Sequence, residues 1–277
     1  MTHDTYHDVL IDTQWLMDHL DDPTVRVVEV DMSREAYNNA HIPGAIFWDI
    51  FADLLTPSLA MNLEPTAIEH LMSRSGISQD TTVIAYGSYP GTGAWIFWFL
   101  KTMGHDNVVV LNGGQQKWIA EGRPRTSTVP SFAPTHYQAS SPDESLRVLQ
   151  ADVQASLERT DCVLIDVRTL EEYRGEIFMM KPPEGAERGG HIPGAVHLAH
   201  TLTLNEDGTF KSAEELGTLY RSQGITPDKT IFPYCAIGAR SACIWFVLKY
   251  LLGYPTVRNY DGSWNEWSRL PTAPIEP

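Results

Sequence analysis

The sequence His41-Ile42-Pro43-Gly44-Ala45 recurs without change as His191-Ile192-Pro193-Gly194-Ala195. An apolar run that ends in an acid precedes each copy: residues 27–31 (Val-Val-Glu-Val-Asp) before the first and residues 163–166 (Val-Leu-Ile-Asp) before the second. Short runs rich in β-branched residues are typical of strands buried in a parallel sheet. The sequence therefore indicates two copies of one structural unit.

The two copies stay in step further along the chain. Residues 82–86 and 230–234 predict a second strand in each copy, and each is followed by a glycine-containing loop and an apolar segment, residues 94–100 or 242–248. Both segments are apolar on every side, as expected for a helix that is covered all round. The repeat predicts an α/β fold with two tandem domains, each a mostly parallel central sheet flanked by helices.

The ends of the copies also correspond, and the stretch between them differs in composition. Asn112-Gly113-Gly114 and Asp261-Gly262-Ser263 follow the apolar segments, and a tryptophan stands four positions beyond each triplet. Residues 123–143 are rich in Pro, Ser and Thr and show no periodicity, which is typical of a connecting segment. We therefore expect an N-terminal domain over residues 1–125, a linker over 126–143 and a C-terminal domain over 144–277.

The second copy also carries an insertion. Asp31 and His41 are 10 positions apart, whereas Asp166 and His191 are 25 apart, so about 15 residues are added in the second copy. Inserted loops on a repeated scaffold are frequent places for function. We expect the insertion to form part of the rim of an active site.

The composition and charge of the chain limit its partners. Of the 277 residues 43% are hydrophobic, and the net charge is −15. Binding of nucleic acid requires a basic face, so we expect none, and an acidic protein is repelled by anionic membranes. No apolar run approaches the roughly 20 residues of a membrane span, and residues 1–8 lack the layout of a signal peptide. We expect no membrane association and a cytoplasmic location.

Three cysteines are present, Cys162, Cys235 and Cys243. They are too few and too scattered for a disulfide framework, and their spacing does not suggest zinc; we expect neither a metal nor a cofactor. Cys162 begins a predicted strand and Cys243 lies inside a predicted apolar helix, so both are expected to pack in the core. Cys235 stands between a strand and a helix and is the candidate nucleophile.

Cys235 begins the loop Cys235-Ala236-Ile237-Gly238-Ala239-Arg240. The N–H groups of this loop and the dipole of the next helix would favour a thiolate and stabilise a bound anion. Gly238 allows a tight curve, and the small Ala236 and Ala239 would keep the mouth of a pocket open. The first copy has Gly87 where the second has Cys235, so we expect the first copy to be inactive.

Residues 234–241 (Tyr-Cys-Ala-Ile-Gly-Ala-Arg-Ser) resemble the active-site loop of the rhodanese (thiosulfate sulfurtransferase) family, particularly a tandem-domain subgroup whose loop reads Cys-Arg-Ile-Gly-Glu-Arg. Both His-Ile-Pro-Gly-Ala motifs, Asp166-Val167-Arg168 and residues 260–264 (Tyr-Asp-Gly-Ser-Trp) also match that family. The resemblance covers nearly the whole chain. It implies two rhodanese-like domains, of which only the C-terminal one is catalytic.

The resemblance implies a sulfurtransferase that works by double displacement. Cys235 would take the outer sulfur of a small donor such as thiosulfate as a persulfide, and a thiol or cyanide acceptor would remove it. The loop N–H groups would hold the terminal sulfur as an oxyanion hole holds developing charge. The residues implied in substrate binding are Ala236, Ile237, Gly238, Ala239, Arg240, Arg168 and Trp264.

Three of these residues have two possible roles each. Arg240 either neutralises an anionic donor or pairs with an acid and braces the loop. Arg168 either faces the pocket or forms a structural ion pair. Trp264 either lines the pocket or packs in the core.

The loop departs from the subgroup at two positions, since Ala236 replaces its Arg and Ala239 its Glu. Where other family members have an Arg in the turn after the strand, this chain has Glu171-Glu172-Tyr173. The loop thus loses one charge of each sign, and the Arg missing at Ala236 and the Arg missing from the turn are cations that would hold a dianion such as thiosulfate. These departures leave sulfur transfer better supported than thiosulfate as the donor.

Three alternatives have features that discriminate among them. The 3-mercaptopyruvate branch has a Ser two residues beyond the Cys, where this chain has Ile237. Cysteine phosphatases have five residues between Cys and Arg, whereas four lie between Cys235 and Arg240, a loop better matched to one sulfur atom than to phosphate. A non-catalytic sulfur carrier or regulatory module is the third alternative, because Ala236 could weaken turnover and leave the persulfide site in place.

Overall fold

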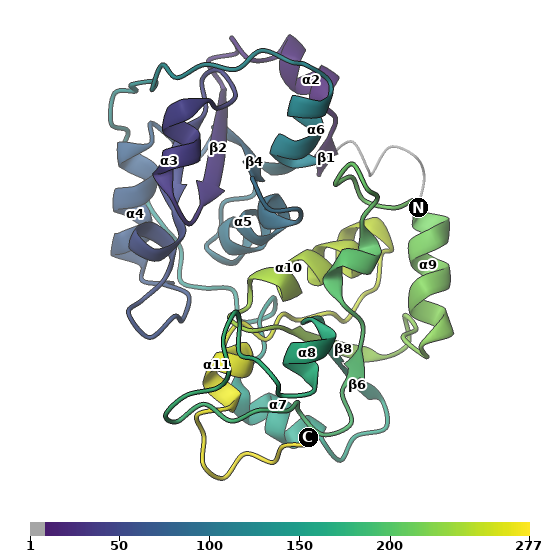
Figure 1. Ribbon diagram of the computed structural model, residues 1–277. Helices are drawn as coiled ribbons and strands as arrows, with labels where there is room; N and C mark the ends of the chain where they lie inside the picture. Colours follow the sequence, from purple (N-terminus) through teal and green to yellow (C-terminus); the bar gives the residue numbers. More distant parts are fainter. Residues whose placement is uncertain (1–8) are drawn as a thin grey trace. The chain divides into compact units, whose positions relative to one another are not determined.

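Five parallel strands form the sheet of the first of two units in the computed structural model, which describes residues 9–277 (Figure 1). They lie in the order β1-β5-β4-β2-β3. Their bounds are β1 Leu10–Ile11, β2 Val25–Asp31, β3 Ile46–Asp49, β4 Thr82–Gly87 and β5 Val108–Leu111. The helices of this unit are α2 Thr13–Asp18, α3 Arg34–Asn39, the π-helical turn η1 Ile50–Leu54, α4 Pro65–Arg74, α5 Thr92–Thr102 and α6 Gly114–Ala120.

Three parallel strands form the sheet of unit 2, in the order β7-β6-β8. Their bounds are β6 Cys162–Asp166, β7 Val196–His197 and β8 Thr230–Tyr234. The helices are α7 Gln150–Ser156, α8 Leu170–Tyr173, the 3-10 turn η2 His200–Thr203, α9 Ala213–Ser222, α10 Ala239–Phe246, the π-helical turn η3 Val247–Leu251 and α11 Ser263–Trp267. The α/β class and the parallel sheets predicted for both copies are confirmed.

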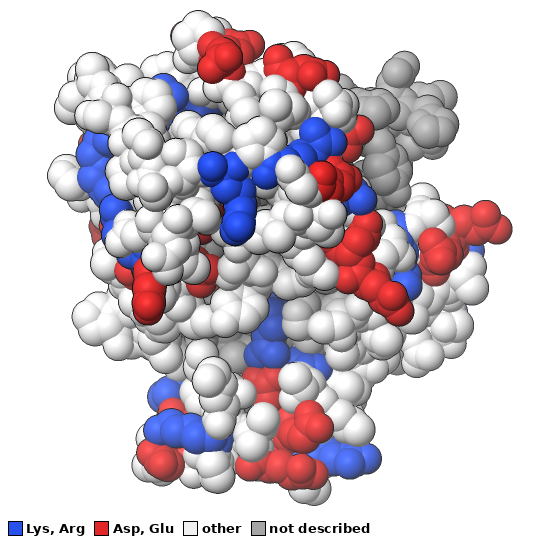
Figure 2. Space-filling model, turned by 45° about the horizontal axis from the view of Figure 1, so that its top comes forward, with Lys and Arg blue, Asp and Glu red and all other residues white. Residues whose placement is uncertain are grey.

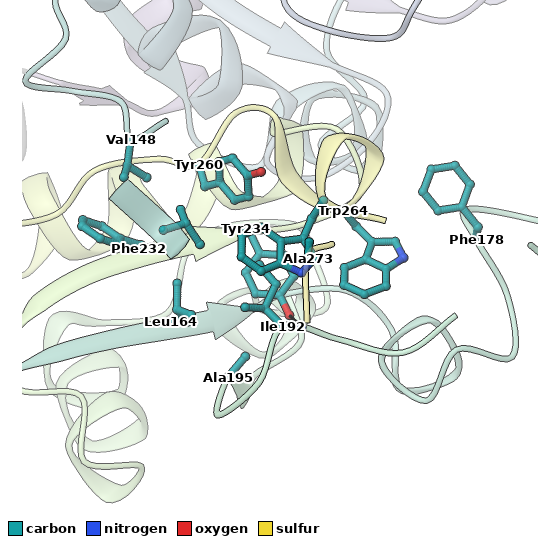
Figure 3. Packing of buried hydrophobic residues seen from close by; sticks show 12 residues of the cluster. Val148, Leu164, Phe178, Ile192, Ala195, Phe232, Tyr234, Tyr260, Trp264 and Ala273 are labelled. Atoms are coloured by element: carbon teal, nitrogen blue, oxygen red, sulfur yellow. Dashed lines mark hydrogen bonds between the residues drawn. The ribbon is translucent and has the colours of Figure 1, made fainter. Parts of the chain in front are cut away.

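The two apolar helices are buried as the sequence predicts. In α5 every residue from Gly93 to Leu100 is buried, and in α10 every residue from Ser241 to Phe246 is buried. Cys243 therefore packs in the core of unit 2, with 1% of its surface exposed. The core of unit 2 also gathers side chains from β6, β8 and α11, among them Leu164, Phe232 and Trp264 (Figure 3).

Each unit contains segments that are not consecutive in the sequence, so no single position divides the chain into the two units. Unit 1 comprises the described residues up to Ser58, Asn62–Asp143 and Leu204–Phe210, and unit 2 comprises Leu59–Met61, Glu144–Thr203 and Lys211–Pro277. The segment 126–143, expected as a linker, contacts unit 1 along its length: Thr135 N–H donates to the carbonyl of Ser73 (3.1 Å), and the Arg26 guanidinium lies 3.4 Å from the Phe132 ring centre.

The segment Leu204–Phe210, expected in the C-terminal domain, groups with unit 1. It closes on itself through an antiparallel bridge between Leu204 and Phe210. Its Asp207 carboxylate pairs with Lys117 of α6 at 2.8 Å. The N–H of Phe210 donates to Asn112 Oδ1 at 3.0 Å.

The repeated His-Ile-Pro-Gly-Ala motif closes each unit. His41 exchanges two backbone hydrogen bonds with Thr126 (2.9 Å each), and His191 exchanges two with Glu276 (2.8 and 3.0 Å). Each imidazole stacks on a tyrosine of the preceding helix, His41 on Tyr37 at 3.8 Å and His191 on Tyr173 at 3.7 Å between ring centres. The motif therefore joins the middle of each unit to a segment much later in the same unit, at Thr126 in unit 1 and at Glu276 in unit 2. This is a structural role for both histidines.

Strand register corrects the pairing of acidic residues between the copies. Glu29 lies beside Tyr86, and Asp166 lies beside the equivalent Tyr234. Glu29, and not Asp31, is thus the counterpart of Asp166, so the insertion is 13 residues long and not 15. Asp31 occupies the place of Arg168, so Glu29 lacks the arginine that Asp166 has. Burial, offset only in part by the hydrogen bond from Tyr86, raises the pKa of Glu29 to about 7.

A carboxyl whose pKa is higher in the folded state than in the unfolded one stabilises the protein less as pH rises. For Glu29 the pKa rises from 4.5 to about 7, and this shift corresponds to about 3 kcal/mol of free energy. We expect the free energy of unfolding of unit 1, measured in urea titrations, to fall from pH 5 to pH 8, and Glu29→Gln to remove most of that slope. Glu35→Gln, at an exposed carboxyl of α3, is the control and should leave the slope unchanged; an equal slope in the Glu29→Gln variant would contradict this expectation.

Arg188 links the insertion to residues 267–273 by hydrogen bonds. Its guanidinium donates hydrogen bonds to four backbone carbonyls, those of Trp267, Ser268, Leu270 and Ala273. Its own carbonyl accepts the indole N–H of Trp264 at 3.1 Å. The insertion therefore supports helix α11, and its place on an active-site rim stays a prediction.

The charges are distributed without a basic stripe on the face drawn in Figure 2. Lys and Arg side chains there lie in small groups separated by uncharged areas and by Asp and Glu. Such a face does not favour a polyphosphate chain. Within residues 9–277, no helix has both the length and the apolar character needed to cross a membrane.

Candidate active site

Cys235 follows the last residue of β8 and is fully buried. The loop after it turns sharply and enters helix α10 at Ala239. Because the N–H groups of the first turn of a helix have no acceptor within the helix, those of α10 are available to a group at its N-terminus. Cys235 is thus set between a rigid strand and a source of hydrogen-bond donors.

Two donors reach the sulfur of Cys235. The N–H of Gly238 donates to Sγ at 3.2 Å. The Ser241 hydroxyl has a single hydrogen, which it can direct either to Sγ at 3.7 Å or to the carbonyl of Gly238 at 3.1 Å. Donors aimed at a sulfur stabilise its anionic form more than its neutral one. This geometry suits a sulfur that acts as a nucleophile.

Gly238 is required by both backbone conformation and space. Its φ is +89°, a region that residues with a side chain rarely adopt. A Cβ atom at this position would lie 2.7 Å from the carbonyl oxygen of Asp261. The side-chain amide of Asn259 holds the Gly238 carbonyl at 3.1 Å, which fixes the curve from the other side.

The other loop residues lie partly where the sequence predicts. Ile237 and Ala239 are half-buried, so both retain some exposed surface. Ala236 is only 2% exposed, and its carbonyl accepts the N–H of Asn265 at 2.8 Å. Ala236 was expected to keep a pocket mouth open and instead forms part of the wall, because α11 packs directly over this peptide.

Arg240 forms a two-point ion pair with Glu172. Its two terminal nitrogens lie 2.7 and 2.8 Å from the two carboxylate oxygens, and the Glu172 side chain is 1% exposed. Burial alone would raise the pKa of Glu172, but the hydrogen bonds and charge of Arg240 hold it below its usual value. Glu172 also closes a capping box with Thr169 at the start of α8. Of the two roles expected for Arg240, this geometry supports bracing of the loop.

Arg168 and Trp264 lie beneath the loop. Arg168 is fully buried, its guanidinium binds the carboxylate of Asp166 (Nη2 to Oδ2 2.6 Å), and it also donates to the carbonyl of Gly190 at 2.8 Å. Trp264 is 1% exposed, and the Arg168 guanidinium lies 4.5 Å from its ring centre. Neither offers surface to a substrate, so the structure supports an ion-pair role for Arg168. It supports a core position for Trp264 (Figure 3).

Three residues near the loop are missed by the sequence reasoning. Glu172 holds Arg240, Ser263 bonds to the backbone of Cys235, and His200 lies close to Arg240. Burial and then the charge of Arg240 lower the pKa of His200 to about 4, so this imidazole is neutral at physiological pH. The capping-box spacing Thr169-x-x-Glu172 is a signal that could have identified Glu172.

The loop of unit 1 differs from that of unit 2 in its length as well as in its first residue. Three residues separate Gly87 from the left-handed Gly91, whereas two separate Cys235 from Gly238. Gly87 stands where unit 2 has Cys235, and a Cβ atom there would lie 2.5 Å from the carbonyl oxygen of Val30. The loop from Gly87 to Gly91 lines a cavity of about 20 Å³, enough for roughly one water molecule. Among residues 9–277, no three His, Cys, Asp or Glu side chains gather so as to hold a metal ion.

The chain matches a family model twice. The model for the rhodanese-like domain matches residues 12–121 and 149–270. A sulfur carrier protein, TtuD of Thermus thermophilus, is 48% identical over 274 residues, which are 97% of this chain and 96% of that protein. A putative thiosulfate sulfurtransferase of Haloferax volcanii is 44% identical over 278 residues, with coverage of 97% and 96%.

Solved structures agree with these matches. A structure of the anaerobic ergothioneine biosynthesis enzyme of Chlorobium limicola, in complex with trimethyl histidine, has a TM-score of 0.86 and 26% identity over 99% of this chain and 71% of that one. A variant of EanB with a cysteine persulfide, in a tetrahedral intermediate state with ergothioneine, has a TM-score of 0.87 and 26% identity over 98% of this chain and 71% of that one.

Proposed function

Because this chain belongs to the rhodanese family and is a sulfurtransferase, we propose that it carries sulfane sulfur as a persulfide on Cys235, with thiosulfate as the donor. The observation that carries the proposal is the Gly238 N–H, which points at Cys235 Sγ from 3.2 Å at the entrance to α10. A donor so placed stabilises the sulfur anion that attacks the sulfur donor and that is released when the acceptor takes the sulfur.

The reaction has two displacements. The Cys235 thiolate attacks the outer sulfur of thiosulfate, an Sγ–S bond forms, the S–S bond of thiosulfate breaks, and sulfite leaves with the electron pair. An acceptor such as cyanide or a thiolate then attacks the outer sulfur of the persulfide, and the Cys235 thiolate is released. No external oxidant or reductant is needed, because the sulfane sulfur moves without a net change in oxidation state.

The residues around the loop bear on the choice between thiosulfate and 3-mercaptopyruvate. The two donors that reach the sulfur, the Gly238 N–H and the Ser241 hydroxyl, are both neutral. The cation of Arg240 is held by Glu172, so it is not fully available to neutralise a dianion. Ile237 cannot supply the hydroxyl of the 3-mercaptopyruvate branch, which supports thiosulfate over that donor.

Parallel product assays test the proposal. The protein is supplied with thiosulfate or 3-mercaptopyruvate as donor, and with cyanide or a small dithiol as acceptor, while sulfite, pyruvate and thiocyanate are measured. We expect sulfite and thiocyanate from thiosulfate to appear faster than pyruvate from 3-mercaptopyruvate. Faster formation of pyruvate would reverse the order of donors, and no product with either donor would contradict the proposal.

A sulfur-carrier role is the second candidate, and the name of the Thermus thermophilus relative, 48% identical to this chain, favours it. A carrier loads one sulfur and holds it for a protein acceptor. In the same assays it would release one equivalent of sulfite from thiosulfate and then stop, even when cyanide is present.

A further inference from the structure

Ser263 has an unusual backbone conformation. Its φ is +52°, and only two other non-glycine residues among those described, Leu59 and Met179, have a positive φ. A side chain in this left-handed region crowds its own backbone, so a serine there carries a conformational cost that glycine avoids. Ser263 is also fully buried, so solvent exposure does not account for its polar side chain.

The same position in unit 1 is a glycine. Gly114 has a φ of +50°, and like Ser263 it is the last member of the repeated triplet that opens a helix, α6 in unit 1 and α11 in unit 2. The backbone shape is therefore common to both units. Unit 1, which has Gly87 at its loop, has glycine at this left-handed position. Unit 2, which has Cys235, has serine there in spite of the conformational cost.

The hydroxyl of Ser263 explains the difference. Its Oγ accepts the N–H of Cys235 at 3.0 Å and donates to the carbonyl of Tyr260 at 2.7 Å. Neither glycine nor alanine can replace these bonds, and a buried N–H without an acceptor is unfavourable. The next residue binds the other polar group of Cys235, because the N–H of Trp264 donates to the Cys235 carbonyl at 3.0 Å.

We propose that Ser263 is a positioning residue for sulfur transfer. Its hydroxyl, presented by a strained backbone, fixes the peptide of Cys235 so that Sγ stays at the N–H of Gly238. This inference rests on the proposed function, in which Cys235 is the residue that takes the sulfur. Reaction rates depend steeply on such alignment, because a displacement of about 1 Å can cost roughly a hundredfold.

Two substitutions separate positioning from stability. Ser263→Gly removes both the hydroxyl and the strain, whereas Ser263→Ala removes the hydroxyl and keeps the strain. We expect single-turnover sulfite release at saturating thiosulfate to fall roughly tenfold or more in both variants, with the half-saturating thiosulfate concentration unchanged. We expect the melting temperature to fall in Ser263→Ala and to fall less, or not at all, in Ser263→Gly.

Gly114→Ser is the matched control in unit 1. It introduces the strained serine where no cysteine is present, so it should lower the melting temperature and leave the rate unchanged. A Ser263→Gly variant with the wild-type rate, or one whose rate loss follows only from a higher half-saturating thiosulfate concentration, would overturn the inference.

A second measurement does not depend on the donor. Alkylation of Cys235 by iodoacetamide, followed by peptide mapping, should also be slower in both Ser263 variants than in the wild type. If thiosulfate does not load the wild-type protein, the proposed donor fails, and the alkylation rates alone then decide whether Ser263 positions Cys235; equal rates would overturn the inference.

Discussion

Cys235→Ser is expected to abolish sulfur loading completely. After incubation with thiosulfate, intact-protein mass spectrometry should show the wild-type chain heavier by one sulfur, about 32 Da, and the variant unchanged. Serine keeps the size of the side chain, but its hydroxyl is a far weaker nucleophile near neutral pH and cannot form a persulfide. The donors around the site, Gly238 N–H and the Ser241 hydroxyl, cannot compensate for the missing sulfur.

Cys162→Ser is the matched control for this experiment. Cys162 is half-buried at the first position of β6, and burial raises the pKa of its thiol, which disfavours the reactive thiolate. The Cys162→Ser chain should therefore gain the same mass as the wild type. If the adduct persists in Cys235→Ser and disappears in Cys162→Ser, then Cys162 and not Cys235 carries the sulfur.

The second large effect is expected from Arg240→Met. This substitution leaves the carboxylate of Glu172, which is 1% exposed, without its cation. Removing one partner of a buried ion pair costs about 3 to 5 kcal/mol, so the free energy of unfolding of unit 2 should fall by about that amount at pH 8. In the wild type, Arg240 lowers the pKa of Glu172, so the pair stabilises the fold above the ordinary pKa of a carboxyl and is lost on acidification.

In Arg240→Met the burial of Glu172 is opposed only by the N–H of Thr169 and the charge of Arg168, so protonation relieves the unpaired charge and the difference from the wild type should widen from pH 5 to pH 8. The double variant Glu172→Gln/Arg240→Met is the control. Glutamine can still close the capping box with Thr169, and no charge is left unpaired, so most of the stability should return. If Arg240→Met keeps the wild-type stability and only raises the KM for thiosulfate, Arg240 is a donor-binding group and not a brace.

Much of the fold could be predicted because the repeat makes each half a check on the other. The strand predicted over residues 230–234 has those bounds, and that predicted over 82–86 ends one residue later, at Gly87. The apolar helices were recognisable because burial on all sides leaves no polar face, as in α5. The loop after β8 was recognisable because strand, Cys235, glycine and helix follow one another in the sequence.

What could not be predicted depends on contacts between distant residues. Arg240 and Glu172 are 68 positions apart, and nothing local in the sequence pairs them. The pairing of Asp31 with Asp166 was wrong because two acids, Glu29 and Asp31, lie two positions apart in one strand, and only strand register decides between them. The wall position of Ala236 depends on the N–H of Asn265, which reaches the loop from α11.

Gly87 also decides whether unit 1 could hold a reactive sulfur of its own. A Cβ atom at this position would lie 2.5 Å from the Val30 carbonyl oxygen and 2.8 Å from two side-chain carbons of Thr92, closer than side-chain atoms approach in folded proteins. A cysteine introduced at position 87 would therefore collide with the Val30 carbonyl and the Thr92 side chain. A second reactive sulfur in unit 1 would therefore require the end of β2 and the start of α5 to move apart, so a single substitution at Gly87 cannot supply it.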